Sequence, residues 1–156
     1  LLRDEFLQIK KRIKRKKDKL NIFLAMGGAD HSNINIKILN VIKNFKKLHV
    51  NVVSTTANKN LKMLENYCKK NSFVTLHVNS TKMATLITDC DFAIVTPSVT
   101  INEVFLLKKP IIAIKTAKNQ IDIFNFLKKN MEFTISKFNK EKLNYVIEKL
   151  LTKKKL

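Results

Sequence analysis

Short apolar runs alternate along the chain with segments in which apolar residues recur at helical spacing. The first run, residues 21–26, carries no charge and predicts a buried strand. Behind it, apolar residues fall three or four positions apart, which predicts a helix with one side turned toward a core. The inward positions of this helix are Ile34, Ile38, Val41, Ile42 and Phe45.

The same alternation continues to the end of the chain. Further strands are expected at 49–54, 73–78, 92–95, 111–115 and 132–136. Helices are expected at 60–70, 81–89, 101–107, 119–130 and 140–152. A regular order of strand and helix is typical of an α/β domain.

The composition of the strands indicates how they are arranged. They are β-branched apolar runs without polar alternation, as expected of parallel strands that are covered on both faces. We therefore predict a doubly wound α/β domain, with a parallel six-stranded sheet and helices on both faces, over residues 20–156. Residues 1–19 are expected to form a linker or bracing helix. In such sheets, ligands bind outside the carboxyl ends of the strands, where the strand order reverses.

The charge of the chain suggests another class of function. The formal net charge is +19, with basic peaks at residues 10–19 and 152–156. A charge of this size is typical of proteins that bind nucleic acid or another anionic surface. Lysine dominates over arginine, however, and aromatic residues do not interleave with the basic runs. Coding bias and solvated helix faces explain this pattern better, so nucleic acid is not the expected partner.

The remaining composition excludes several classes of protein. No uncharged apolar run reaches the ~20 residues that a membrane helix requires, and the start of the chain has no secretory signal. Cys68 and Cys90 lie far apart without zinc-ligand spacing, which argues against zinc and gives little support for a disulfide framework. We expect a globular cytoplasmic protein with no membrane span, no cofactor and no metal.

Three loops that follow predicted strands contain candidate binding residues. The first contains Gly27 and Gly28, the only two glycines of the chain. A glycine pair at a strand-to-helix turn lets the backbone approach a ligand closely, and the N–H groups of the following helix favour an anion. A plain tight connection is the alternative, because neither the G-x-G-x-x-G nor the P-loop pattern is present.

The second loop is VTPSVTINEV, residues 95–104. Ser98 is placed to cap a helix, and free N–H groups from Ser98 to Thr100 are able to hold a phosphate. Glu103 offers two acceptor oxygens to the two hydroxyl groups of a ribose. Thr100 and Glu103 also match a capping box, so the structural and the ligand-binding interpretations are about equally supported.

The third loop is KTAKNQ, residues 115–120. Asn119 is either an ordinary N-cap of the next helix or, together with Lys118, a source of polar groups for a sugar or a phosphate.

The stretches MGGADHSN and LHVNSTKMATLITDCDFAIVTPSVTINEVFLLKKPIIAIKTAKNQ carry a resemblance to a known family. They resemble the C-terminal half of GT-B nucleotide-sugar enzymes, in particular the UDP-sugar hydrolases of pseudaminic acid biosynthesis. These are themselves similar to the N-acetylglucosaminyltransferase that acts on the peptidoglycan precursor. The opening LLRDEF also resembles the segment that precedes the second domain in those hydrolases.

The resemblance implies a binding site for UDP and its sugar. Gly27 and Gly28 match the glycine-rich loop near the diphosphate. The backbone around Met83 matches the part that faces the uracil, and Asn119 and Gln120 match residues that border the sugar and the diphosphate.

The second loop also has a counterpart in the family. Ser98, Val99 and Thr100 match the turn that offers N–H groups to the phosphates, and Glu103 matches the acid that holds the ribose. Pro97 departs from the small residues or glycine of the relatives. Because proline has no N–H and a fixed φ, this departure removes one potential phosphate donor.

For the complete enzyme, the resemblance implies hydrolysis of a UDP-linked 6-deoxy diamino sugar with release of UDP. It places the catalytic histidine in an N-terminal domain that nothing in this chain matches. We therefore expect the chain to bind a UDP-sugar without turning it over, with that missing domain as its partner. A glycosyltransferase half with the same UDP site and a basic nucleic-acid-binding module remain the alternatives.

Overall fold

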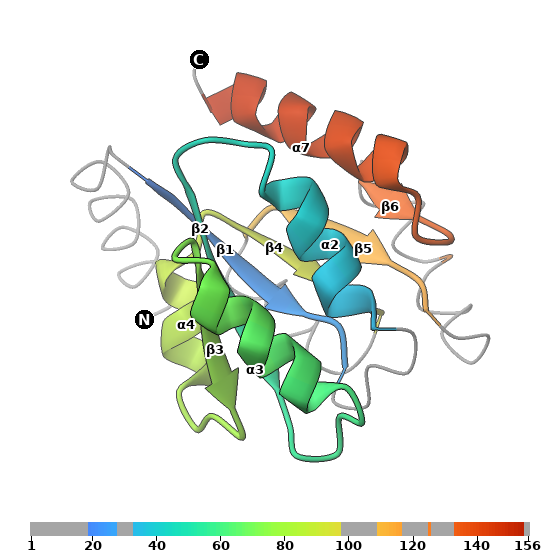
Figure 1. Ribbon diagram of the computed structural model, residues 1–156. Coiled ribbons are helices and arrows are strands. Elements are labelled where there is room, and N and C mark those ends of the chain that lie inside the picture. Colours follow the sequence, from blue (N-terminus) through green and yellow to red (C-terminus); the bar gives the residue numbers. More distant parts are fainter. Residues whose placement is uncertain (1–18, 28–32, 98–108, 117–124, 126–132, 155–156) are drawn as a thin grey trace.

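Six parallel strands form one sheet in the order β3-β2-β1-β4-β5-β6 (Figure 1). The computed structural model describes residues 19–27, 33–97, 109–116, 125 and 133–154. The strands are β1 (Leu20–Ala25), β2 (Leu48–Ser54), β3 (Val74–Val78), β4 (Phe92–Val95), β5 (Ile111–Ile114) and β6 (Thr134–Ile135).

The strand order reverses between β1 and β4. β1 pairs with β2 on one side and with β4 on the other, although β4 comes later in the chain than β3. The doubly wound parallel sheet that the sequence predicts is therefore confirmed.

Helices cover both faces of the sheet. The helices are α2 (Ile34–Ile42), α3 (Leu61–Lys70), α4 (Met83–Asp89) and α7 (Lys140–Lys154). Three of these helices, α2, α3 and α7, lie on the face turned to the viewer in Figure 1. Their side chains Ile38, Leu64 and Leu143 belong to one hydrophobic cluster. Ile87 of α4 belongs to a second cluster on the opposite face.

The side chains of β1 contribute alternately to the two clusters. Ile22 and Leu24 pack in the first cluster, and Phe23 and Ala25 pack in the second. Successive side chains of a strand point to opposite faces, so this alternation places apolar residues against both layers of helices. It explains why the strand has no polar alternation in its sequence.

The ends of some elements differ from those that the sequence predicts. β4 has the predicted bounds, whereas α4 begins at Met83 instead of residue 81. Ser80 Oγ accepts a hydrogen bond of 3.0 Å from the Lys82 N–H, which closes a turn ahead of that helix. β6 contains only Thr134 and Ile135, each of which pairs with one residue of β5. The helices expected at 101–107 and 119–130, and the segment 1–18, lie outside the described residues, apart from residue 125.

Candidate functional site

A cavity of about 240 Å³ opens where β1, β2 and β3 end. Because all strands are parallel, their carboxyl ends lie along one edge of the sheet, which we call the carboxyl edge. Ala25 and Ser54 are the last residues of β1 and β2, and Asn79 follows the last residue of β3. The lining residues are Ala25, Gly27, Val53, Ser54, Thr55, Asn79, Ser80 and Met83.

Asn79 fixes one wall of this cavity. Its backbone adopts a left-handed conformation with a φ of 50°, which asparagine tolerates better than most residues. The Asn79 N–H donates to the Ser54 carbonyl at 2.9 Å, and its Oδ1 accepts from the Thr56 N–H at 3.3 Å. These two bonds tie the end of β3 to the loop that follows β2.

A second set of hydrogen bonds orders the loop between β2 and α3. Asn58 is buried, and its Nδ2 donates to Ser54 Oγ at 3.0 Å. Its Oδ1 accepts from the Asn60 N–H at 2.8 Å, and Thr55 Oγ1 accepts from the Ala57 N–H at 3.2 Å. The polar rim of the cavity is thus held in place by side chains of its own loop.

Gly27 lies at the end of β1 with a φ of 89°, a conformation that favours glycine strongly. A Cβ placed there would lie 3.9 Å from Thr96 Cγ2, which is an ordinary contact. The backbone conformation, and not crowding by Thr96, therefore calls for glycine at this position. The absence of a side chain also leaves the backbone open to the cavity that it lines.

Thr96 connects the ends of three strands. Its N–H donates to the Ala25 carbonyl at 3.2 Å, and its Oγ1 is hydrogen-bonded to Thr116 Oγ1 at 3.1 Å. Thr96 and Pro97 are both buried. The last described residues before the second predicted binding loop are therefore anchored at the switch between β1 and β4.

The structure brings two of the predicted binding residues together, because Gly27 and Met83 line the same cavity. The other predicted binding residues lie outside the described residues, and their roles stay predictions; they are Gly28, Ser98, Val99, Thr100, Glu103, Asn119 and Gln120. Sequence reasoning missed the polar rim of the cavity, although polar residues directly after two predicted strands were a usable signal. These rim residues are Ser54, Thr55, Asn79 and Ser80.

Two histidines lie on β2 and β3, away from the lining of the cavity. His49 Nε2 is hydrogen-bonded to Thr75 Oγ1 at 2.9 Å, and His77 Nε2 to Asn51 Oδ1 at 3.1 Å. Burial lowers the pKa of both imidazoles below the ordinary value, and nearby lysines lower it further. The neutral form is therefore favoured, and these side chains have structural partners. The third histidine, His31, lies outside the described residues.

Three further features of the described residues concern metal binding, membrane helices and thiols. In the described part of the chain, no group of three or more His, Cys, Asp or Glu side chains is placed to hold a metal ion. None of the described helices combines the length and the apolar character that a membrane span needs. Cys68 and Cys90 are both free thiols, and burial raises the pKa of the Cys68 thiol to about 11.

The start of α2 contains buried polar atoms without hydrogen-bond partners. Asn35, in the first turn, is fully buried, and neither its Oδ1 nor its Nδ2 is hydrogen-bonded to any residue that the structure describes. Asn33 precedes the helix with a φ of 55°, makes no capping bond with its side chain, and also has an unpartnered Oδ1. Unpaired buried polar groups destabilise a fold, so their presence beside the glycine loop is typical of a site that serves a purpose other than stability.

Most of this chain is similar in sequence to one part of a hydrolase. It is 30% identical over 129 residues to the UDP-2,4-diacetamido-2,4,6-trideoxy-beta-L-altropyranose hydrolase of Campylobacter jejuni. The match covers 83% of this chain and 46% of that protein, so the chain spans about half the length of this relative. No profile of a known protein family matches the chain.

Solved structures show the same fold. MurG of Acinetobacter baumannii superimposes with a TM-score of 0.69 at 17% identity, over 92% of this chain and 44% of MurG. Anabaena HepE, solved in complex with UDP and glucose, superimposes with a TM-score of 0.65 at 14% identity, over 97% of this chain and 44% of HepE. The chain has the Rossmann-like fold of one half of a GT-B enzyme, and the resemblance found in the sequence is confirmed.

Replacing Asn35 by leucine, which has a similar size, should stabilise the fold. The change removes an amide whose two polar atoms are buried without partners, each of which costs about 1–3 kcal/mol. We expect Asn35→Leu to raise the free energy of unfolding in urea and the melting temperature by several degrees. The matched control is Asn66→Leu at an exposed position of α3, which should change stability by less than about 0.5 kcal/mol. A destabilised Asn35→Leu protein would contradict this account of the α2 start.

Proposed function

We propose that the chain is the UDP-binding half of a nucleotide-sugar hydrolase that acts on a UDP-linked 6-deoxy diamino sugar and releases UDP. The observation that carries this proposal is the cavity at the carboxyl edge, which both Gly27 and Met83 line. Both residues match the UDP-binding pattern of the family, and the chain is 30% identical to a hydrolase of such a sugar nucleotide.

The cavity suits the base end of the nucleotide. Its volume of about 240 Å³ is smaller than the ~300–1,000 Å³ of sites that enclose a whole drug-sized ligand. Ala25, Val53 and Met83 provide apolar surface for a flat ring, while Ser80 and Asn79 supply polar groups at its edge. In this proposal the backbone around Met83 faces the uracil, and the rest of the ligand extends along the carboxyl edge toward β4.

The phosphates would lie at the turn that follows β4. Ser98, Val99 and Thr100 would donate backbone N–H groups, and Glu103 would accept hydrogen bonds from the ribose hydroxyls. Pro97 supplies no N–H to this turn. Thr96, which is bonded to Ala25 and Thr116, would keep the turn next to the β1 loop that contains Gly27 and Gly28. Asn119 and Gln120 would border the sugar from the loop after β5.

The chemistry would be divided between two domains. A base in an N-terminal domain would activate the attacking water, and this chain would bind the nucleotide and stabilise the departing diphosphate with backbone N–H groups. Closure of the cleft between the domains would assemble the site. The free thiols Cys68 and Cys90 fit the cytoplasm, a reducing compartment in which we expect the protein to act.

A glycosyltransferase half is the second candidate. It is favoured by the structural likeness to MurG and to HepE, the latter solved with UDP and glucose. A transferase would use the same UDP site and pass the sugar to an acceptor instead of water.

A nucleic-acid-binding module would instead use the basic run at residues 10–19, and its affinity for any duplex would fall steeply with salt.

Calorimetric titration with UDP separates the nucleotide site from the basic run. Glu103→Ala should weaken UDP binding by about tenfold or more, because hydrogen bonds to a charged group contribute about 1.5–3 kcal/mol. A control protein in which Lys14, Lys16 and Lys17 are replaced by alanine should bind UDP like the unmodified chain. Met83→Ala should weaken the binding of uridine, UMP and UDP by a similar factor, since Met83 lines the cavity assigned to the base.

Two results of this titration would contradict the proposal. One is the absence of any heat of binding at millimolar UDP. The other is loss of UDP binding in the triple lysine variant with full binding retained in Glu103→Ala, which would assign the ligand to the basic run.

The isolated chain should not hydrolyse the nucleotide sugar. The two histidines on β2 and β3 have structural hydrogen-bond partners and lie outside the cavity lining, so no described histidine is placed to activate water there. Incubation of the chain with the UDP-linked diacetamido sugar, followed by chromatography of released UDP, should show no release above the buffer rate. Enzyme-dependent release of UDP from the isolated chain would overturn the division of roles between the domains.

A further inference from the structure

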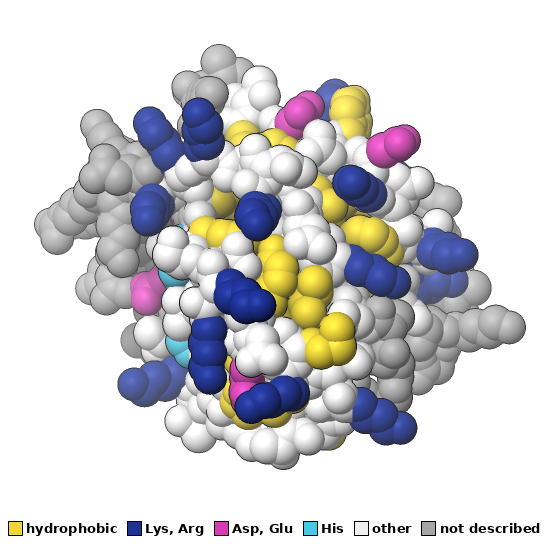
Figure 2. Space-filling model, viewed as in Figure 1, with side chains coloured by type: hydrophobic (Ala, Val, Ile, Leu, Met, Phe, Trp, Pro, Cys, Tyr) yellow, Lys and Arg dark blue, Asp and Glu magenta, His cyan; other side chains and the backbone are white. Residues whose placement is uncertain are grey.

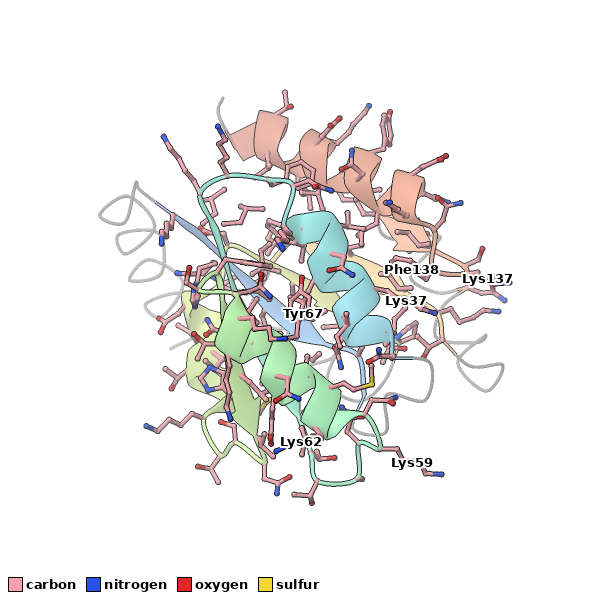
Figure 3. All side chains as sticks on the ribbon, viewed as in Figure 1. Lys37, Lys59, Lys62, Tyr67, Lys137 and Phe138 are labelled. Atoms are coloured by element: carbon pink, nitrogen blue, oxygen red, sulfur yellow. The ribbon has the colours of Figure 1, made fainter. Side chains whose placement is uncertain are left out.

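Four exposed lysines lie on segments that leave the carboxyl edge of the sheet. Figure 3 labels them on α2, at the start of α3 and after β6, and Figure 2 shows Lys and Arg side chains spread over the whole face that α2, α3 and α7 cover, with a few Asp and Glu side chains among them. We call them the carboxyl-edge lysines: Lys37, Lys59, Lys62 and Lys137.

The topology explains why residues so far apart in sequence share one edge. Lys37 is in the first half of α2, which follows β1. Lys59 and Lys62 lie just before and within the first turn of α3, which follows β2, and Lys137 comes two residues after β6. Each segment leaves the carboxyl end of a parallel strand, so the four charges collect on the same side of the molecule as the cavity.

These charges are not neutralised within the described part of the chain. None of the four ammonium groups takes part in an ion pair or hydrogen bond there. No acidic residue occupies the first turn of α2, α3 or α4, where acidic side chains usually balance the positive end of a helix, whereas α7, which follows Lys137, has Glu141 in its first turn. Asp89 and Asp91 lie beside the start of β4, at the opposite edge of the sheet.

The lysines do not line the cavity, which contains no lysine among its described lining residues. Apolar side chains also reach the surface between lysines on the face that Figure 2 shows. Tyr67 and Phe138 are half-buried against the core, and the Tyr67 hydroxyl donates to Asn40 Oδ1 at 2.8 Å. Among the described residues of this side of the molecule, exposed lysines outnumber acidic residues, one of which is Glu141 in the first turn of α7.

We propose that the carboxyl-edge lysines steer nucleoside diphosphates toward the cavity without contacting them in the bound state. This inference rests on the proposed function. Charges near a binding site raise the local concentration of an oppositely charged ligand and increase association rates by about 10- to 1,000-fold. The range of this attraction at physiological salt is about 8 Å, and it shortens to about 3 Å at 1 M salt. Steering consequently acts on the association rate and disappears at high salt.

The test measures the association of a fluorescent UDP derivative by stopped flow at several salt concentrations. In the test variant, Lys37, Lys59, Lys62 and Lys137 are replaced by glutamine, which removes four charges from the formal net charge of +19. The matched control replaces four exposed lysines at the opposite edge of the sheet, next to the ends of α2 and α3: Lys43, Lys46, Lys69 and Lys70. Circular dichroism confirms that both variants remain folded.

We expect the association rate of the test variant to fall by about tenfold at low salt, with the dissociation rate unchanged and the difference lost near 1 M salt. In the control variant, the logarithm of the association rate should fall by less than about half as much as in the test variant, because the replaced charges lie farther from the site. Fluorescent uridine, which has no phosphate, should associate equally fast with all three proteins.

Three outcomes would overturn the inference. An unchanged association rate in the test variant would show that the lysines do not steer the ligand. An equal decrease of the association rate in the test and control variants would show that the effect comes from the net charge alone. A faster dissociation rate with unchanged association would show direct contact with bound ligand. Absence of UDP binding to the unmodified chain is a different result, which contradicts the proposed function and this inference with it.

Discussion

The position of β1 between β2 and β4 is the constraint on which the candidate site depends. Ile22, Phe23 and Leu24 are fully buried, and their alternation fills the layers of apolar side chains on both faces of the sheet. A strand paired on both sides and covered on both faces has no freedom to shift, because a slip of one residue would turn every side chain to the wrong face. The end of β1 therefore delivers Gly27 to a fixed point at the switch in strand order.

The polar rim of the cavity is built on this fixed frame. Ser54 receives hydrogen bonds from Asn58 and, at its carbonyl, from Asn79, so the ends of β2 and β3 are held together. Thr96 performs the same role between β1, β4 and β5. Apolar strands thus provide the stability, and short polar side chains at their carboxyl ends provide the geometry. Asn35 differs from these residues, because within the described part of the chain no hydrogen bond offsets the burial of its side chain at the start of α2.

The sequence predicts the strands and the class of fold well, because periodicity reports burial directly. It places β4 correctly, and two residues that the family resemblance singles out, Gly27 and Met83, line one cavity, while their roles in binding stay predictions. It does not predict the left-handed Asn79 or the Ser80 turn ahead of α4, since both depend on hydrogen bonds between residues that only the fold or the local turn brings together. The sequence alone also does not show which of the many lysines lie near the cavity, because the parallel topology is what places Lys37, Lys59, Lys62 and Lys137 at the carboxyl edge.

The central claim, that the cavity at the carboxyl edge receives the base of a uridine nucleotide, is tested most directly by nuclear magnetic resonance. UDP is titrated into the ¹⁵N-labelled chain, and the shift of every backbone amide is followed. The account predicts that the largest shifts among the described residues occur at Gly27, Thr55, Asn79, Ser80 and Met83, which line the cavity. Saturable shifts that are confined to the opposite edge of the sheet, for example at Lys47 and Asn71, with none at the cavity, would contradict it.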